Sequence, residues 1–390
     1  MYPNRKTTVA AVALWTAALG LLAGCGSGPP ESNATATASG RATASGQPAD
    51  GCPEALQKAK AAVRAAERTD TAWTGPRSGP EAVPGKTLVY VAQTMTNPGV
   101  AGVAKGVREA AEAIGWNVRI IDGEGTPAGI QAAFSQAVTL KPSGIVIGGF
   151  DPRLTAQQVA RAEEAGIPLI GWHAVSSPGP STSPKLFTNI TTKVEDVAGI
   201  SADWVIARSD GDAGVVVFTD DSIPFARNKA ELIKRQLATC PGVKLLAYEN
   251  IPIPDASQRT PQEISSLLSR FAKKWTHSVA INDLYFADAA PAFRSAGKPG
   301  AGPPFNIGAG DGDPSAFQRI NGGQHQAATV PEPLTQQGWQ IVDEFNRAFA
   351  GSPPSGYVAP VHVVTADNSG GGTSWDPEGY REAYEQIWRG

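Results

Sequence analysis

Residue types that perform catalysis are present in this chain, but their spacing fits no catalytic motif. The four histidines stand at positions 173, 277, 325 and 362, without a close pair of the kind that helical metal sites use. No GxxxxGK[ST], GxSxG or HExxH pattern occurs. Asp220-Asp221 and Asp311-Gly312-Asp313 offer carboxylates, but neither continues to a Glu at the distance that a calcium loop requires. The sequence therefore predicts no enzyme, no metal site and no cofactor.

Cys25 stands in a context that predicts a covalent modification. A short basic start is followed by an apolar run, residues 9–22, which is too short to span a bilayer comfortably. The run ends in Leu22-Ala23-Gly24-Cys25, which is typical of a secretory signal and resembles a bacterial lipoprotein box. An incidental cysteine in a soluble secreted protein is the alternative. We expect a signal peptide at residues 1–24, lipid attachment at Cys25, and anchoring on the extracytoplasmic face of the cell membrane.

The segment after Cys25 separates the anchor from the folded part of the chain. Residues 25–51 are mostly Gly, Ser, Thr, Ala and Pro, and they cannot bury enough apolar surface to offset their chain entropy. We expect a flexible tether there. Cys52 and Cys240 are the two remaining cysteines, and thiols outside the cell membrane are commonly oxidised. We therefore expect a disulfide that pins the helix over 53–68 to the rest of the protein.

The charge balance argues against a nucleic-acid partner. The chain has 33 Lys and Arg against 36 Asp and Glu, a net charge of -3. Neutralising phosphates requires clustered basic residues, which this composition does not favour. With 390 residues, 41% of them hydrophobic, the chain is long enough for two domains or one two-lobed domain.

The remainder of the chain alternates strand-like and helix-like segments. Fully apolar strands between amphipathic helices predict a parallel sheet that is covered on both faces. Two such series follow one another, so we expect an α/β protein with two doubly wound parallel-sheet lobes. The expected strands are 87–92, 117–121, 144–148, 167–171, 214–219, 243–249, 278–282, 305–309, 327–330 and 361–365, and the main expected helices are 53–68, 98–115, 127–140, 154–166, 334–350 and 377–388.

A succession of short motifs over residues 86–365 resembles the type I periplasmic binding proteins of bacterial importers, close to the ribose and galactose binders. The motifs include TLVYVA followed by Thr96-Asn97-Pro98, then EEAGIPLIGWH, SVAINDLYFADAA and IGAGDGDPSAFQRI. The resemblance implies two lobes, joined by a three-strand hinge, that close on a ligand. It implies an N-lobe (86–187 plus 332–359) and a C-lobe (188–331 plus 360–366). Outside them, the sequence pattern predicts an N-terminal helix and connector (52–85) and a polar C-terminal tail with a short helix (367–390).

Ligands of doubly wound sheets bind beyond the carboxyl ends of the strands, and the resemblance implies the same place. The ligand residues expected from the N-lobe are Asn97, Phe150, Asp151, Trp172 and His173. Asn97 stands where the family places a sugar-binding amide, although it could simply cap the following helix. For Trp172 and His173, which replace the Asp-Arg of ribose binders, buried packing is the alternative. Gly99 and Val100 replace the two stacking aromatics of ribose binders, so that half of the aromatic sandwich is missing.

The ligand residues expected from the second half of the chain are Phe225, Arg227, Asn282, Asp283, Asp311 and Glu332. Arg227 and Asp311 match the family's ligand arginine and ligand carboxylate. A solvated helical Arg227, a core Phe225 and a turn-forming Asp311 are the alternatives. Glu332 replaces an amide, and because a carboxylate only accepts hydrogen bonds, it favours ligands rich in hydroxyl donors or a cationic ligand.

Two functions fit these features. The first is a lipid-anchored solute-binding protein that delivers a sugar or polyol to the permease and ATPase subunits of an ABC importer. The second is a sensor lipoprotein that presents a small molecule to a membrane receptor. A cytoplasmic regulator would need a basic helix-turn-helix before residue 86, where this chain has the signal and tether instead. We expect a monomer that binds no nucleic acid, and the identity of the ligand stays open.

Overall fold

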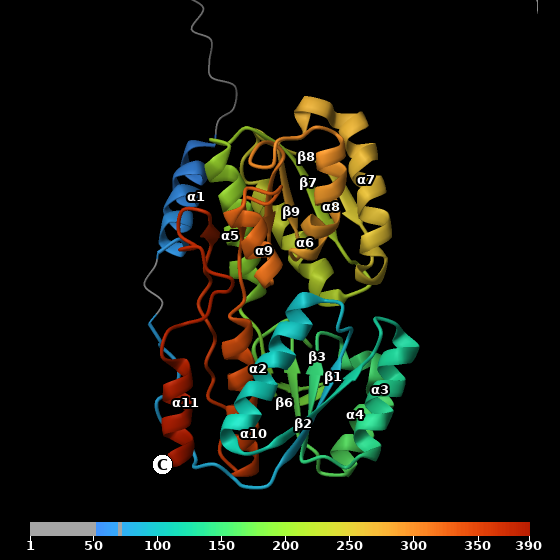
Figure 1. The fold of residues 1–390 in the computed structure, drawn as a ribbon, viewed down its shortest axis with the longest axis vertical. Helices are drawn as coiled ribbons and strands as arrows, with labels where there is room; N and C mark the ends of the chain where they lie inside the picture. The colour runs from blue at the N-terminus through green and yellow to red at the C-terminus, as the bar shows by residue number, and fades with distance from the viewer. Residues whose placement is uncertain (1–51, 69–71) are drawn as a thin grey trace, which may run out of the picture. The chain divides into compact units, whose positions relative to one another are not determined.

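The computed structural model describes residues 52–68 and 72–390, which belong to one compact unit, Pro48–Gly390. The predicted signal peptide, the lipid site Cys25 and the tether lie outside the described residues. Two six-stranded sheets, each flanked by helices, form two lobes of this unit (Figure 1). Their strand orders are β2-β1-β3-β4-β6-β5 and β12-β11-β10-β9-β7-β8. The prediction of two doubly wound lobes is confirmed.

The first lobe shows why its central strands read as apolar runs. In β1, Leu88 and Tyr90 belong to one buried cluster, while Val89 and Val91 belong to a second cluster on the opposite face. Alternate residues of a strand point to opposite faces, so both faces of this sheet are covered. The elements are β1 Thr87–Ala92, α2 Pro98–Ile114, β2 Asn117–Asp122, α3 Pro127–Thr139, β3 Gly144–Gly148, the 3-10 turn η1 Pro152–Thr155, α4 Ala156–Glu164, β4 Leu169–Trp172, β5 Gly179–Thr182, β6 Lys185–Ile190 and α10 Leu334–Phe349.

The second lobe repeats this plan around one large apolar cluster. Its elements are α5 Val194–Arg208, β7 Ala213–Thr219, α6 Pro224–Leu237, β8 Val243–Asn250, η2 Ile253–Asp255, α7 Ala256–Phe271, η3 Ala272–Lys274, β9 His277–Ala280, α8 Leu284–Ser295, β10 Phe305–Gly308, α9 Pro314–Asn321, β11 Ala328–Thr329 and β12 Val364–Thr365. In both sheets the strand that comes first along the chain lies between the second and the third, which creates the topological switch point where doubly wound proteins bind ligands.

One edge of each sheet departs from the predicted parallel arrangement. β5 runs antiparallel to β6, and β12 runs antiparallel to β11. β5 and β6 are joined by a two-residue turn, which makes antiparallel pairing the direct outcome. β5 is partly exposed and contains no large apolar side chain, so it gives none of the hydrophobic pattern by which the other strands were predicted.

Between β1 and β12 the chain passes from one lobe to the other three times. It does so at 191–193, after β6; at 330–333, between β11 and α10; and at 350–363, between α10 and β12. None of these linking segments has regular secondary structure. The lobe boundaries stated above stay predictions.

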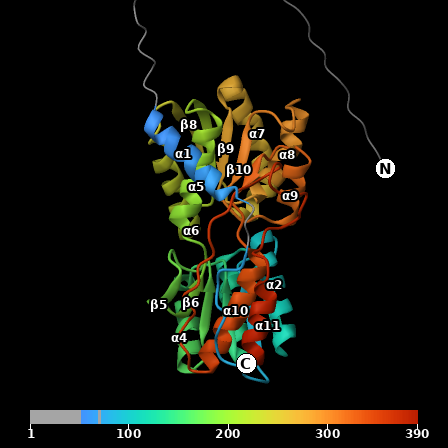
Figure 2. The same cartoon turned by 90° about the vertical axis from the view of Figure 1, so that its left-hand side faces the viewer.

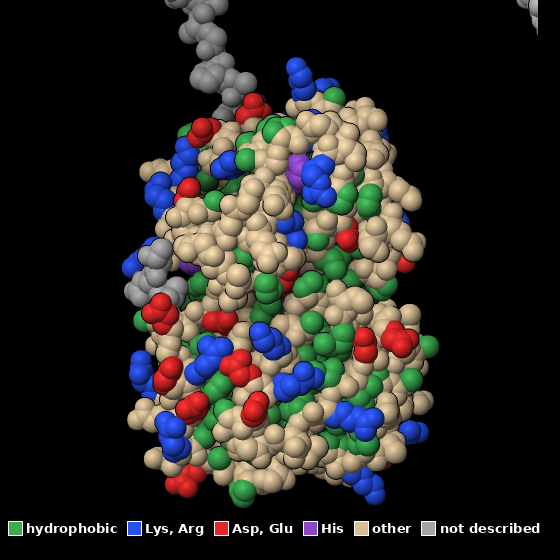
Figure 3. Space-filling model, in the orientation of Figure 1, with side chains coloured by type: hydrophobic (Ala, Val, Ile, Leu, Met, Phe, Trp, Pro, Cys, Tyr) green, Lys and Arg blue, Asp and Glu red, His purple; other side chains and the backbone are tan. Residues whose placement is uncertain are grey.

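A helix near each end of the described chain packs on a different lobe. α1 (Pro53–Ala66) lies along α5 in the second lobe, and α11 (Tyr380–Arg389) lies along α10 and α2 in the first lobe (Figure 2). The indole N–H of Trp388 on α11 donates to the Asp343 carboxylate on α10 at 3.0 Å. On the face shown in Figure 3, acidic and basic side chains are interspersed over the described surface. Within the described residues, none of the helices combines the length and apolar character needed to cross a membrane.

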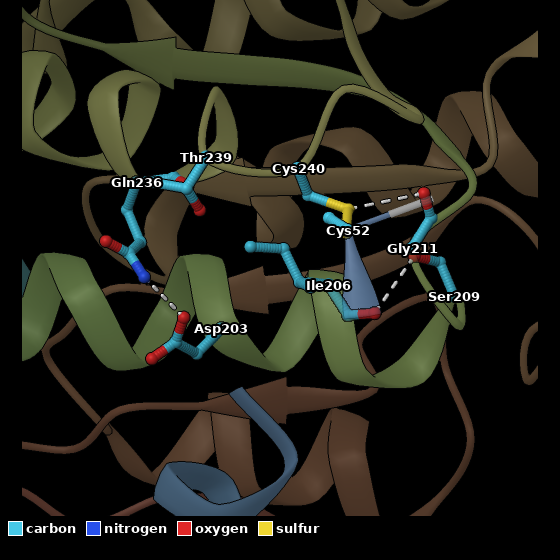
Figure 4. The surroundings of a disulfide bond; sticks show 8 residues. All are labelled: Cys52, Asp203, Ile206, Ser209, Gly211, Gln236, Thr239 and Cys240. Carbon is cyan, nitrogen blue, oxygen red and sulfur yellow. Dashed lines mark hydrogen bonds between the residues drawn. A yellow bond between two sulfur atoms is a disulfide. The ribbon is translucent and has the colours of Figure 1, made fainter. Parts of the chain in front are cut away.

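Cys52 and Cys240 are joined by a disulfide in the structure, across 188 positions of sequence (Figure 4). The bridge attaches the start of α1 to the turn before β8. Gly211 packs against it with φ +82°, where a Cβ atom would stand only 3.1 Å from the Cys240 sulfur. Glycine is therefore the residue that fits this turn. Nearby, Gln236 of α6 donates to Asp203 of α5 at 2.6 Å.

Candidate functional site

A small cavity of about 40 Å³, here called the inner cavity, lies between the lobes at the carboxyl ends of the strands. It has room for a few water molecules and is far smaller than a typical small-molecule pocket, so a sugar would fit only if the lobes moved apart. Both switch points contribute to it: Asn97 and Gly149 follow β1 and β3, and Asn282 follows β9. Its other lining residues are Val100, Trp172, His173, Ile223, Phe225, Ala226, Lys229, Ile253, Ile281 and Asp311.

Three aromatic rings form a stack that crosses from one lobe to the other. The ring centroids of Trp172 and His173 are 4.0 Å apart, and those of His173 and Phe225 are 4.7 Å apart. The Trp172 indole N–H donates to Gln337 Oε1 at 2.7 Å. One face of Trp172 is therefore covered by His173, whose other face meets Phe225 of α6. The contact between His173 and Phe225 therefore joins the two lobes in this conformation, and it is here called the latch.

Asp311 and Lys229 place opposite charges at the inner cavity. Lys229 is buried, with 3% of its surface exposed. Its ammonium group donates hydrogen bonds to the carbonyl oxygens of Ile281 at 3.2 Å and Ala309 at 2.6 Å. Among the described residues, none donates a hydrogen bond to the Asp311 carboxylate. Burial raises the pKa of Asp311 to about 6, although Lys229 and His173 oppose the rise. The carboxylate oxygens are not among the fully enclosed atoms that lack a partner, so a ligand in the cavity that brings hydroxyl donors would reach them.

Gly99 explains why the first lobe approaches Asp311 so closely. A Cβ atom at Gly99 would stand 2.3 Å from Asp311 Oδ2, so any side chain there would collide with the carboxylate. Gly99 lies in the first turn of α2, where the helix dipole favours a negative charge. The glycine that replaces a stacking aromatic of ribose binders thus makes room for Asp311 in this conformation.

Asp283 lies beneath the cavity rather than in its lining. Its carboxylate accepts hydrogen bonds from Gly312 N at 2.7 Å and Thr329 Oγ1 at 3.0 Å, and also from Gln326. Burial, together with the charge of Asp313, raises its pKa to about 8. These contacts hold the backbone that carries Asp311, so Asp283 acts on the cavity through that loop.

Glu332 lies at one of the crossings between the lobes and holds several partners together. It accepts from Thr192 Oγ1 and from Gln337 Nε2, both at 2.6 Å, and its Oε1 is 3.4 Å from His173 Nε2. Burial opposes its ionisation, but His173, Lys229 and the Thr192 hydrogen bond lower its pKa to about 2. Thr192 and Gln337, which sequence reasoning missed, each occupy one acceptor site of this carboxylate, and Glu332 does not line the inner cavity.

The two amides that were expected to bind the ligand also organise the backbone around it. Asn97 Oδ1 accepts from Gly99 N at 3.0 Å and caps α2, while Asn282 Oδ1 accepts from Leu284 N at 3.2 Å. Both residues line the inner cavity. Each amide also has an NH₂ group whose hydrogens are donors, so capping and ligand binding are compatible roles.

Besides Asp283 and Glu332, three more expected site residues lie outside the lining of the inner cavity. Phe150 packs edge-on against Phe134 in the core of the first lobe, with ring centroids 6.3 Å apart. Asp151 pairs with Arg153 and lines a neighbouring cavity of about 340 Å³, here called the outer cavity. Arg227 is exposed and does not line the inner cavity, and its role as a ligand residue stays a prediction. Lys229 lines the cavity instead, because residues four apart share a helix face and Phe225 and Lys229 are both turned to the cavity.

Lys229→Met should lower ligand affinity at pH 7 by about tenfold, because removing the neighbouring positive charge raises the pKa of Asp311 further. Affinity should recover toward the wild-type value at pH 9, where Asp311 is ionised again. Arg227→Met is the matched control, and we expect it to leave affinity unchanged. Calorimetric titration of both variants at the two pH values measures this. Equal effects of the two substitutions would refute the assignment of Lys229 to the site.

With this geometry in place, comparison with known proteins settles the family. The model of the periplasmic binding protein domain matches residues 88–352, more than half of the chain. This chain belongs to the periplasmic binding protein family. The family consists of extracytoplasmic binding proteins rather than enzymes, which confirms the prediction that this binding protein has no catalytic activity. No curated protein sequence matches the chain.

Solved structures of similar fold include proteins with a bound sugar or polyol. A solute-binding protein of an ABC transporter from Agrobacterium vitis, bound with alpha-D-tagatopyranose, matches with a TM-score of 0.64 at 15% identity, over 73% of this chain and 96% of that one. Another from Agrobacterium vitis, with bound allitol, gives a TM-score of 0.61 at 17% identity, over 72% and 95%. GanP, a glucose-galactose binding protein from Geobacillus stearothermophilus, gives 0.61 at 15% identity, over 73% and 99%. These matches establish the type I periplasmic binding protein fold.

Proposed function

We propose that this binding protein captures a sugar or polyol between its lobes and delivers it to the permease of an ABC importer. Lipid at Cys25 would hold it, as a monomer, on the outer face of the cell membrane, with residues 25–51 as the tether. Asp311 carries the proposal, because its buried carboxylate lines the inner cavity and has no hydrogen-bond donor among the described residues. The tagatopyranose and allitol bound to the two Agrobacterium vitis proteins support the same ligand class.

A thermal-shift screen over monosaccharides, polyols and nucleosides tests this function. A ligand present at one hundred times its dissociation constant stabilises the folded state by about 2.7 kcal/mol, which a melting curve readily detects. We expect a shift from one or more sugars or polyols and none from nucleosides. Stabilisation by nucleosides alone would replace the proposed ligand class.

Ligand affinity should fall by roughly tenfold between pH 7.5 and pH 5, because the pKa of Asp311 is about 6. Above this pKa the Asp311 carboxylate is ionised and accepts hydrogen bonds from ligand hydroxyls. Below it, the carboxyl group must first lose its proton before it can accept the same bonds, and that cost lowers the affinity. Glu332 stays ionised throughout, since its pKa is about 2. Titrations of the wild type and of Asp311→Asn across this pH range show whether the pH dependence of affinity comes from Asp311 or from His173, Lys229 and other neighbours. An equally steep pH dependence in Asp311→Asn would exclude Asp311 as its source.

Cys25→Ala should move the protein from the membrane fraction to the soluble fraction or stop processing of the signal, since the thiol is the proposed lipid acceptor. Fractionation of expressing cells, followed by mass spectrometry of the mature N-terminus, measures the outcome. Cys240→Ala provides a cysteine control that should stay membrane-bound. An unmodified Cys25 on the mature native chain would disprove lipid attachment.

A further inference from the structure

The outer cavity has the size and chemistry of a second ligand subsite. Its volume is about 340 Å³, within the range of small-molecule pockets, whereas the inner cavity holds about 40 Å³. Its lining includes four serines, Ser176 and Ser177 from the loop after β4, Ser181 from β5 and Ser183 from the turn after it, and the charged pair of Asp151 and Arg153. Hydroxyls both donate and accept, which matches the hydrogen bonding of a hydroxyl-rich ligand.

The two cavities are neighbours separated by the latch. His173 and Phe225 line both cavities, and so does Ile223. His173 comes from the first lobe and Phe225 from the second, so separation of the lobes parts the two rings. Such a separation would join the inner and outer cavities into one continuous slot, with ring faces on both sides that are suited to the C–H faces of a sugar.

The β5–β6 hairpin and the loop before it make this slot longer than the inner cavity alone. The loop after β4 and strand β5 supply one wall of the outer cavity, and Ile223, Pro224 and Phe225 at the start of α6 supply the other. The outer cavity is therefore also built from both lobes. A ligand that occupied it would bridge them just as a ligand at Asp311 would.

We propose that the outer cavity binds a second glycosyl unit, so that the preferred ligand is a disaccharide or a glycoside whose first ring binds at Asp311. This inference rests on the proposed sugar-binding function and extends it. Two or three added hydrogen bonds should make a disaccharide bind roughly tenfold more tightly than its own monosaccharide.

Calorimetric titration with galactose, glucose and arabinose, and with lactose, melibiose, maltose and cellobiose, tests the proposal. We expect one disaccharide to exceed its component monosaccharide by roughly tenfold or more. Ser181→Trp should fill the outer cavity and abolish that advantage while leaving the monosaccharide affinity unchanged. Thr182→Trp is the matched control, because the next residue of β5 is exposed, points to the opposite face and does not line the cavity.

The outcomes distinguish failure of the second subsite from failure of the sugar-binding function. If monosaccharides bind and no disaccharide binds more tightly, or if Ser181→Trp leaves the disaccharide affinity unchanged, the second subsite is wrong and the sugar-binding function stands. If no mono- or disaccharide binds the wild type, the second subsite is overturned together with the sugar-binding function.

Discussion

Asp311→Ala should weaken sugar or polyol binding by roughly 10- to 150-fold. Hydrogen bonds to an ionised carboxylate contribute about 1.5–3 kcal/mol, and about 1.4 kcal/mol corresponds to one decade in affinity. In the structure this carboxylate lines the inner cavity and faces the buried Lys229. Its loss should therefore act on the ligand directly, and calorimetric titration measures the change.

The melting temperature of Asp311→Ala separates ligand binding from a role in the turn. Folding raises the pKa of Asp311 to about 6. Because an acid whose pKa rises on folding is harder to ionise in the folded state, the ionised Asp311 destabilises that state at neutral pH. The destabilisation is absent below the unfolded pKa and fully present above pH 6. Removing the carboxylate should leave the melting temperature unchanged or raise it at pH 7.5. A lowered melting temperature with intact affinity would show that Asp311 is a structural turn residue.

Replacing both Cys52 and Cys240 by Ser should lower the free energy of unfolding by about 2 to 5 kcal/mol. A bridge between residues 188 positions apart removes a large amount of conformational freedom from the unfolded chain. Ligand affinity should not change, because Cys240 precedes β8 and so lies at the end of the sheet opposite the cavity. Urea unfolding measures the stability, and wild-type protein reduced and alkylated under native conditions is the control that should match the double variant.

Thiol labelling tests whether the bridge forms in the native protein. In the unreduced, denatured chain neither Cys52 nor Cys240 should react with a thiol reagent. Reaction of both would rule out the disulfide, and the double variant should then be as stable as the wild type.

The parts of the fold that the sequence predicted are those with a strong hydrophobic pattern. β1 and β3 are buried on both faces, so 87–92 and 144–148 stand out as apolar runs and were predicted with the observed bounds. β5 is an exposed edge strand without large apolar side chains, and β12 is only two residues long. Their pairing depends on chain geometry rather than on hydrophobic periodicity, and sequence reasoning therefore missed both antiparallel edges.

The residues of the candidate site also fall into those that the sequence predicted and those that it did not. Asn97, Asn282 and Asp311 closely follow strands, and the topology alone directs them to the edge where the cavity lies. Lys229 lies within a helix, where a buried lysine and a solvated one look alike in the sequence. Its spacing of four residues from Phe225, on a helix that begins at Pro224, was the signal that could have preferred it to Arg227. The latch between His173 and Phe225 needs both lobes in place, so no local pattern reports it.

A crystal structure of the protein with the sugar or polyol that gives the largest thermal shift tests interlobe capture most directly. We expect electron density for the ligand between the lobes, with a hydroxyl oxygen roughly 2.5–3.0 Å from an Asp311 carboxylate oxygen and further contacts from the first lobe. In that complex the rings of His173 and Phe225 should have parted around the ligand. A ligand bound on one lobe alone, or between the lobes with Asp311 still lacking a partner, would contradict capture by this site.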